Sequence, residues 1–479
     1  MKKIIASVLC FTMCAAMFAG CNNGSSDEKS TDGTGAAETE TAVEGDTTVS
    51  QTETVEVGTG EITLNVYAMS AEVPGMITEY FKRNPDVASK YKVEAMVSSN
   101  DNQAYETKLN AALAAGGSDA PDLYVAEADY LLPYTVGELS TFAAPYADFI
   151  DDVDGKIATA EVAKYVQELG TNADGKLVAL NYQCTGGAMI YRTDLAEEVL
   201  GAKTPEEVEA AIGAGSNSWD KFWEVADKMK EKGYAIVSGA DDVWNVIEKA
   251  SAQPWVVDNK LTIDDNRMSY LDISKKLYEG NYTNKTDSWS EAWYADMKGA
   301  GEKQVFCFFG PCWLINYVMA NHVVDEATLK GKYNVCTPPV GFWWGGSWLL
   351  ANKDAIADPD KKEIISKIVE WITMDATEDG LQYAWANGTM NEAGTKDTVS
   401  CMAVLNKADG SMDILGGQDP FKIFINATSY ANGNCKCLYD STINSAFKDQ
   451  AKAYAAGEKD KDAAVAEFKD KVAEMGIEV

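Results

Sequence analysis

The chain has 479 residues, which exceeds one ordinary domain, so we expect two large lobes. The 41 Lys and Arg residues are outnumbered by 74 Asp and Glu residues, which gives a formal net charge of −33. A field of this sign repels phosphate backbones, so we exclude nucleic acid as a partner. The single histidine, His322, excludes zinc sites built from several histidines.

The N-terminus has the pattern of a secretory signal. Lys2 and Lys3 precede a short apolar stretch, residues 4–18, that is too short for a permanent membrane span. The small residues Ala19 and Gly20 before Cys21 resemble a bacterial lipobox. We therefore predict a lipoprotein signal peptide over 1–20 and lipidation of Cys21. The alternative is an ordinary signal peptide followed by a chance cysteine.

Residues 21–60 are rich in Gly, Ser, Thr, Asp and Glu and contain almost nothing to bury. Such a segment cannot offset its chain entropy, so we predict a disordered acidic tether. A polar tether directly after Cys21 suits a domain that stands off from a membrane surface. On this interpretation the folded part begins at Glu61.

An alternation of strand and helix patterns follows. Strands are predicted over 62–69, 91–99 and 122–131, with a helix opening at Pro74 and another over 104–117. This order is typical of a parallel α/β sheet, in which ligands bind at the carboxyl ends of strands. The polar residues that fall at these ends are Ser70, Glu72, Glu127 and Asp129.

Further along, residues 174–195 indicate a strand, a bend at 185–187 and a second strand. Amphipathic helices are predicted over 218–233 and 462–475. Apart from Cys21 and the two cysteines of the signal, seven cysteines remain, an odd number. Their spacing fits no zinc motif, so we interpret them mostly as small buried hydrophobic residues, with one disulfide still open. No metal and no cofactor is expected.

All twelve tryptophans lie at or beyond position 219. Several stand in stretches flanked by Gly or Pro, where a packed helix does not need them. Exposed rings in loops are good platforms for the apolar faces of sugars, while nearby carboxylates accept hydroxyl hydrogen bonds. The candidates for stacking are Trp255, Trp293, Trp313, Trp344 and Trp348. The alternative for any one of them is core packing.

Three stretches together resemble the extracellular solute-binding proteins of bacterial carbohydrate ABC importers, the maltose-binding-like class: KLNAALAAGGSDAPDLYVAEADYL (108–131), DGKLVALNYQCTGGAMIYRTDL (174–195) and WGGSWLLANKDA (344–355). The resemblance implies an α/β fold of two lobes, the type II periplasmic-binding-protein-like fold. Each lobe would hold a mainly parallel sheet flanked by helices, and a hinge of several crossings would join them. The implied N-lobe covers 61–183 and 344–400, and the implied C-lobe covers 184–343 and 401–479.

By position, the resemblance also assigns residues to the cleft. Ser70 and Glu72 would lie on the first cleft loop, and Glu127 and Asp129 would bind hydroxyl groups. Tyr182 and Gln183 would form the hinge floor. The remaining assignments are sugar-stacking or rim positions: Trp255, Trp293, Trp313, Trp344, Trp348, Tyr383 and Trp385.

The implied function is capture of an oligosaccharide by lobe closure, followed by delivery to the permease subunits of an ABC importer. The protein would be monomeric, without enzymatic activity, and lipid-anchored at the extracellular face of the cell membrane. The runner-up is a secreted glycoside hydrolase, because 74 acids offer many acid and base pairs. A surface adhesin and a binding protein for a peptide, iron or a polyamine are further alternatives.

Overall fold

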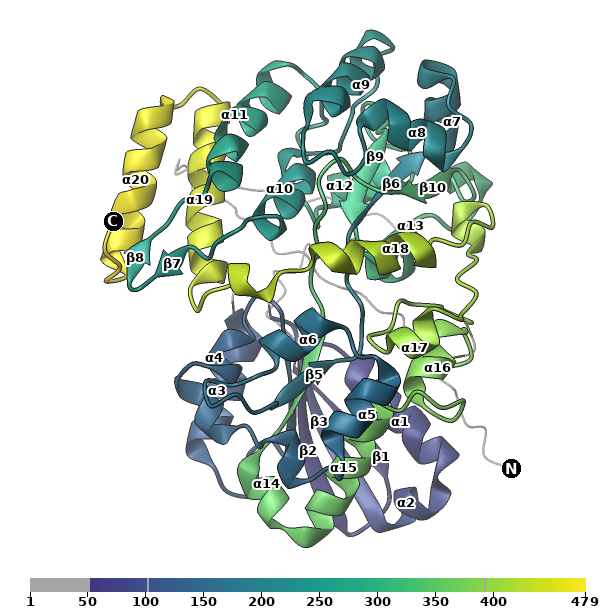
Figure 1. The fold of residues 1–479 in the computed structure, drawn as a ribbon, viewed down its shortest axis with the longest axis vertical. Helices are drawn as coiled ribbons and strands as arrows, with labels where there is room; N and C mark the ends of the chain where they lie inside the picture. Colours follow the sequence, from purple (N-terminus) through teal and green to yellow (C-terminus); the bar gives the residue numbers. More distant parts are fainter. Residues whose placement is uncertain (1–51, 101–102, 392) are drawn as a thin grey trace, which may run out of the picture.

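The computed structural model describes residues 52–100, 103–391 and 393–479 and shows two lobes, one above the other, joined by several crossing segments (Figure 1). The predicted signal peptide, Cys21 and the tether up to residue 51 lie outside the described residues. Among the described residues, no helix is long and apolar enough to cross a membrane.

The N-lobe is built on a six-stranded sheet with the order β1-β3-β2-β4-β11-β5. In β2, Leu64, Val66 and Ala68 are buried and alternate with less buried neighbours, as one sheet face requires. Strand β2 is parallel to β3 and β4, which confirms the parallel unit predicted from the sequence. Strand β11 runs antiparallel to β4 and β5 because it enters from the other lobe. The strands are β1 (Thr52–Gly58), β2 (Ile62–Ala68), β3 (Tyr91–Ser98), β4 (Leu123–Glu127), β5 (Ala179–Asn181) and β11 (Ser347–Ala351).

Helices surround this sheet (Figure 1). They are α1 (Glu72–Arg83), α2 (Pro85–Lys90), α3 (Ala104–Ala115), α4 (Leu132–Thr135), α5 (Val153–Ala160), α6 (Lys164–Leu169), α14 (Lys353–Ala357), α15 (Pro359–Thr373), α16 (Leu381–Ala386) and α17 (Met402–Leu405). The predicted helices at Pro74 and over 104–117 are α1 and α3, and both are confirmed.

Strand β1 corrects the predicted tether. It pairs antiparallel with β3 along its whole length, from Thr52 opposite Ser98 to Gly58 opposite Lys92. The expectation that the chain is disordered up to residue 60 is therefore wrong for Thr52–Gly58. Valines alternate with polar residues in this short segment, which lets it pair with the edge of β3. Its composition alone did not show that β3 has an edge to pair with.

The C-lobe contains a three-stranded sheet with the order β10-β6-β9 and the strands β6 (Ala188–Arg192), β9 (Cys307–Gly310) and β10 (Tyr333–Cys336). Both of its ladders are antiparallel, which differs from the mainly parallel sheet expected for each lobe. The reason is connectivity: β6 leaves the crossing region, whereas β9 and β10 run back toward it. A small hairpin joins β7 (Val256–Val257) and β8 (Lys260–Leu261).

The C-lobe helices are α7 (Thr193–Leu195), α8 (Pro205–Ile212), α9 (Asp220–Glu231), α10 (Ala240–Lys249), α11 (Asp265–Glu279), α12 (Glu291–Met297), α13 (Ala320–His322), α18 (Phe421–Ala427), α19 (Asp440–Ala455) and α20 (Lys461–Glu474). Helices α9 and α20 confirm the two amphipathic helices predicted from the sequence. Phe222, Val225 and Met229 of α9 are buried, as are Phe468 and Val472 of α20.

The crossing segments hydrogen-bond to one another and form the hinge. Cys184 N donates to Thr398 O at 3.0 Å, and Trp344 N donates to Thr185 O at 2.9 Å. The predicted lobe boundaries at 183 and 343 fall beside these bonds. The predicted boundary at 400 falls too early, because α17 contacts α5 and α16 of the N-lobe.

The cysteines of the described chain are all free, and every one except Cys437 is buried. Burial raises the pKa of the thiols, for example that of Cys184 to about 12, so they are inert at neutral pH. Within the described residues, no group of three or more His, Cys, Asp or Glu could hold a metal ion.

Candidate functional site

The site lies where the carboxyl ends of β2 and β4 face the C-lobe. Strand β4 ends at Glu127, and the chain then turns sharply. Ala128 N donates to Gly346 O at 3.1 Å, and Asp129 N donates to Glu127 Oε2 at 2.9 Å. The second bond holds the carboxyl group of Glu127 against the backbone of this turn.

A pair of glycines brings a crossing segment against this turn. Gly345 and Gly346 have φ angles of +76° and +113°, which residues other than glycine rarely adopt. A Cβ atom on Gly346 would lie 2.2 Å from Asn181 Nδ2, which leaves no room for a side chain. A Cβ atom on Gly345 would lie 3.4 Å from Glu127 Oε1 and 3.3 Å from Trp313 Nε1. Because Gly345 has no side chain, Glu127 of the N-lobe and Trp313 of the C-lobe can both approach the backbone at this point.

Three tryptophans pack together here, and we call them the tryptophan wall (Trp289, Trp313 and Trp344). The rings of Trp289 and Trp313 are stacked, with centroids 6.1 Å apart and planes at 9°. Trp313 and Trp344 meet edge to face at 4.8 Å, and Trp313 Nε1 donates to Trp344 O at 3.2 Å. Trp289 and Trp313 are only half-buried, so both keep some contact with solvent.

A second aromatic group lies deeper, at the hinge. Tyr182 stacks on Trp385 with centroids 5.4 Å apart and planes at 18°. The Tyr182 hydroxyl donates to Glu72 Oε2 at 2.6 Å, and Trp385 Nε1 donates to the Tyr317 hydroxyl at 3.0 Å. Glu72 and Tyr182 come from the N-lobe and Tyr317 from the C-lobe, so this group also spans both lobes.

Asp397 lies on the hinge and is 1% exposed. It accepts from Gln183 Nε2 at 3.2 Å and from Thr398 N at 2.7 Å. The Cys312 side chain also contacts it, and Cys312 precedes Trp313 in the chain. Asp397 therefore links the tryptophan wall to the group around Tyr182.

Glu72, Glu127 and Asp397, which we call the cleft acids, have no ion-pair partner among the described residues. Burial raises the pKa of Glu127 to about 8, and the nearby charge of Asp129 adds to this effect. Burial likewise raises the pKa of Glu72 to about 7 and that of Asp397 to about 6. All three carboxyl groups therefore lose their proton at a higher pH than an exposed carboxyl group does, Glu127 at the highest.

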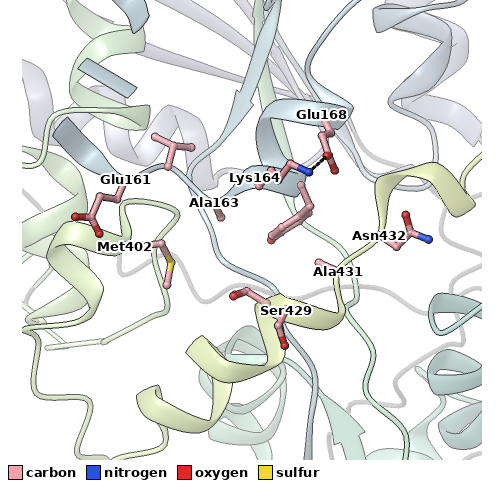
Figure 2. A pocket seen from close by; sticks show the side chains of 11 residues that line it. Glu161, Ala163, Lys164, Glu168, Met402, Ser429, Ala431 and Asn432 are labelled. Atoms are coloured by element: carbon pink, nitrogen blue, oxygen red, sulfur yellow. Dashed lines mark ion pairs between the residues drawn. The ribbon is translucent and has the colours of Figure 1, made fainter. Parts of the chain in front are cut away.

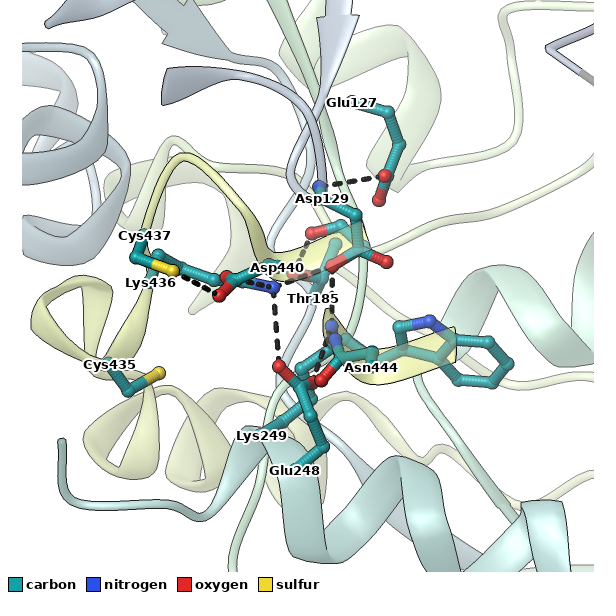
Figure 3. A network of polar contacts seen from close by, with 12 residues as sticks. Glu127, Asp129, Thr185, Glu248, Lys249, Cys435, Lys436, Cys437, Asp440 and Asn444 are labelled. Carbon is teal, nitrogen blue, oxygen red and sulfur yellow. Dashed lines mark hydrogen bonds and ion pairs between the residues drawn. The ribbon is translucent and has the colours of Figure 1, made fainter. Parts of the chain in front are cut away.

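Asp129 has the opposite surroundings. Its Oδ1 atom lies 2.5 Å from Lys249 Nζ and 2.6 Å from Lys436 Nζ, and both lysines belong to the C-lobe. Burial alone would raise the pKa of Asp129, but the two lysines hold it well below its usual value. Buried Glu248 and Asp440 complete what we call the interlobe ion cluster (Asp129, Glu248, Lys249, Lys436 and Asp440). Figure 3 shows Glu127 joined only to the backbone of Asp129 and outside this network.

Most of the predicted site residues gather in this region: Glu72, Glu127, Asp129, Tyr182, Gln183, Trp313, Trp344 and Trp385. Ser70 is next to them, and its hydroxyl accepts a 3.4 Å hydrogen bond from Glu72 N. Tyr383 lies on α16 and packs against the larger hydrophobic core. The role of these residues in binding stays a prediction.

Three predicted sugar platforms are core residues instead. Trp255 is fully buried between Phe447 and Phe468, with the guanidinium carbon of Arg267 4.2 Å from its ring centroid. Trp348 lies in β11, between β4 and β5, and is also fully buried. Glycine and proline residues near Trp255 and Trp348 suggested exposed loops, and the sequence did not show that tertiary packing buries both side chains.

Trp293 is the third correction. It is 1% exposed on α12, and its Nε1 atom donates to Asp242 Oδ1 at 3.0 Å. Its ring packs against Trp289, with centroids 5.5 Å apart. Trp293 thus supports the tryptophan wall from behind and offers no face to a ligand.

The sequence did not single out several residues that the fold brings here. Asp397 and Lys436 stand in polar stretches without a motif, and Tyr317 and Lys249 lie on amphipathic segments. Of the residues brought here, Trp289 could have been found from the sequence, because it stands in the same polar stretch as Trp293, SWSEAWYADM (288–297).

A separate groove of about 690 Å³ lies between the lobes, lined by α6 on one side and residues 428–432 on the other (Figure 2). Neither a cleft acid nor a member of the tryptophan wall lines it. Its walls come from both lobes, so its volume depends on the angle between them.

Comparison with known families decides the class of the chain. The model of the bacterial extracellular solute-binding protein family matches residues 75–366, which is more than half of the chain. The chain belongs to this family. Solute-binding proteins of this kind deliver ligands to transporters, so the interlobe region just described is the expected place for a ligand.

Solved structures show the same two-lobed fold. An extracellular solute-binding protein of family 1 aligns with a TM-score of 0.67 and 17% identity over 86% of this chain and 99% of its own. The galacto-N-biose-/lacto-N-biose I-binding protein of the Bifidobacterium longum ABC transporter aligns with a TM-score of 0.61 and 16% identity over 88% and 99%. A binding protein from B. animalis subsp. lactis, solved with β-1,6-galactobiose, has a TM-score of 0.59 and 18% identity over 87% and 98%. No curated protein matches the chain.

Proposed function

We propose that this solute-binding protein captures an oligosaccharide between its lobes and delivers it, unchanged, to the permease of an ABC importer. The observation that carries the proposal is the tryptophan wall beside Glu127: half-buried rings for the apolar faces of sugars, next to a carboxyl group that can bond hydroxyls. The sugar complexes of structural neighbours support the same ligand class.

Closure would work by a shift of population. A ligand that touches Glu127 and Tyr182 from the N-lobe and Trp313 from the C-lobe binds the closed form better than an open one. Its binding energy therefore closes the lobes, and the closed shape is what the permease would recognise. Removal of the signal peptide and acylation of Cys21 would keep the protein at the extracellular face of the membrane, as a monomer.

The test is titration calorimetry of the chain from residue 22 onward against a panel of α- and β-linked oligosaccharides, with tryptophan fluorescence recorded in parallel. We expect micromolar binding of one glycan family, a fluorescence change and no cleavage. Cleavage of the bound glycan would instead establish a glycoside hydrolase. Absence of binding to every glycan, with the protein folded, would contradict the proposal.

Trp313→Ala provides the site-specific variant. Loss of one stacking platform is expected to weaken binding by about thirtyfold, or about 2 kcal/mol. The matched control is Trp223→Ala, because Trp223 is also half-buried but packs against Tyr282 and Lys276 in the C-lobe, away from the site. Equal affinity losses in both variants would show that the wall is not the binding surface.

A further inference from the structure

Where the lobes meet, acidic side chains outnumber basic ones among the described residues of the site. Both lysines near the site, Lys249 and Lys436, are already bonded to Asp129 within the interlobe ion cluster. Nothing cationic among the described residues pairs with the three cleft acids, although each is at least half-buried. Burial of carboxyl groups without a positive partner is unfavourable, so a function for this imbalance is expected.

The surroundings of Glu127 fit a positive ligand group. Its Oε1 atom and the Trp313 indole nitrogen both lie within 3.4 Å of the point where a Gly345 side chain would begin. The edge of Trp344 packs against Trp313 at the same place. An ammonium group beside Glu127 would be held by the charge of the carboxylate, while the neighbouring tryptophans would pack against the apolar part of the same ligand.

The second and third acids continue this pattern. Glu72 bonds the hydroxyl of Tyr182, whose ring stacks on Trp385. Asp397 connects this group to Trp313 through Cys312. Carboxyl groups and aromatic rings therefore alternate through the junction of the lobes. Tyr182, Trp385 and Asp397 are buried, so we expect direct contact with the ligand charge at Glu127 and weaker effects at Glu72 and Asp397.

We propose that the captured ligand is a saccharide with free amino groups, whose ammonium lies against Glu127 and the tryptophan wall. This inference rests on the proposed function, since it names the substrate class of the same site. A neutral sugar can only hydrogen-bond the carboxyl group of Glu127, whereas the ammonium of an amino sugar also pairs with its ionised form, and the sugar still presents an apolar ring face for stacking.

Release of a proton on binding is an independent readout of contact between an ammonium group and Glu127. The groups that face Glu127 are Asp129, Lys249 and Lys436, and with burial they leave its pKa at about 8. At pH 6.5 Glu127 is therefore protonated, and an arriving ammonium, itself already charged at this pH, would displace the proton. A neutral sugar would leave the proton in place. Calorimetry in buffers of different ionisation enthalpy measures the difference.

The experiment uses oligosaccharides that share one backbone and carry an amine, an acetamide or a hydroxyl at carbon 2, for every backbone in the panel described above. We expect the amine form to bind at least tenfold more tightly than the hydroxyl form and to release protons at pH 6.5. Glu127→Gln should abolish both the preference and the release. The control Glu458→Gln removes one exposed charge from the C-lobe surface and should change neither.

The outcomes separate the two proposals. Binding of neutral and amine forms with equal affinity overturns the amino-sugar inference and leaves the oligosaccharide function intact. Binding of an aliphatic polyamine such as spermidine, and of no saccharide, overturns both. Thermal unfolding of Glu127→Gln checks that the variant is folded, and Glu72→Gln serves as a second variant in which a smaller loss of preference is expected.

Discussion

Glu127 and Asp129 lie two residues apart at the end of β4, yet their electrostatic surroundings are opposite. Asp129 reaches two lysines of the other lobe, which keep it charged. Glu127 lies beside Trp313 and forms no ion pair with either lysine, and burial raises its pKa to about 8. One turn of the chain thus carries Asp129, whose negative charge is paired with two lysines, and Glu127, whose carboxyl group forms no ion pair.

The comparison shows how closure is balanced between the protein and its ligand. The interlobe ion cluster contributes to closure whether or not a ligand is present, because its contacts join the lobes directly. The cleft acids oppose closure in the empty protein, since they lose water and gain hydrogen bonds but no positive partner. A ligand that satisfies them removes this opposition, which makes closure depend on the ligand.

The change with the largest expected effect is Asp129→Asn. It removes the ion pairs of Asp129 with the buried Lys249 and Lys436, so we expect a loss of about 3 kcal/mol in the free energy of unfolding, at the low end for a broken buried pair because Glu248 stays near both lysines. The ligand-free protein should also become more open. Urea unfolding and the radius of gyration from small-angle scattering measure both effects. An unchanged radius of gyration would show that the cluster does not hold the lobes together.

A smaller effect is expected from Glu127→Gln, and its sign depends on pH. In the wild type the folded-state pKa, about 8, lies above the usual value of 4.5, so the unfolded chain loses this proton first. Stability therefore decreases as pH rises from about 4.5 to 8. The glutamine variant lacks this term and should melt about 2 °C higher than the wild type at pH 8.

Below pH 4.5 the carboxyl group of Glu127 is protonated in both states, so the melting temperatures of the two proteins should converge there. Differential scanning calorimetry at pH 4, 6 and 8 follows this trend. A variant that is less stable than the wild type at pH 8 would indicate that Glu127 is charged and paired, contrary to the geometry described here.

The smallest effect is expected where an ion pair is exposed. Asp287 and Lys452 form a 2.8 Å pair with side chains that are 65% and 72% exposed. Asp287→Asn should change the free energy of unfolding by less than about 0.5 kcal/mol. Urea unfolding of Asp287→Asn and Asp129→Asn side by side tests whether the effect comes from loss of any negative charge or from loss of one between the lobes. Similar decreases in the free energy of unfolding of both variants would show that the position between the lobes has no special role.

Much of the fold could be predicted because local patterns and connectivity determine it. Alternating apolar residues predicted β2, and helical spacing predicted α9 and α20. The order of strands and helices over residues 62–131 predicted the parallel unit. Strand β1 was missed because its pairing depends on the free edge of β3, which no local pattern reveals. The antiparallel C-lobe sheet was missed for a similar reason, since strand direction follows from where the chain re-enters the lobe.

The sequence by itself determined that acids stand at the end of a strand and that tryptophans concentrate in the second half of the chain. Only the tertiary structure decided which tryptophans face the cleft, because Trp255 and Trp313 have similar neighbours in sequence but different neighbours in space. Tertiary structure also decided the charge of each acid. Asp129 meets Lys436 across 307 residues of sequence, and Glu127 does not, because electrostatic energy depends on distance in the folded protein and on the water that folding removes.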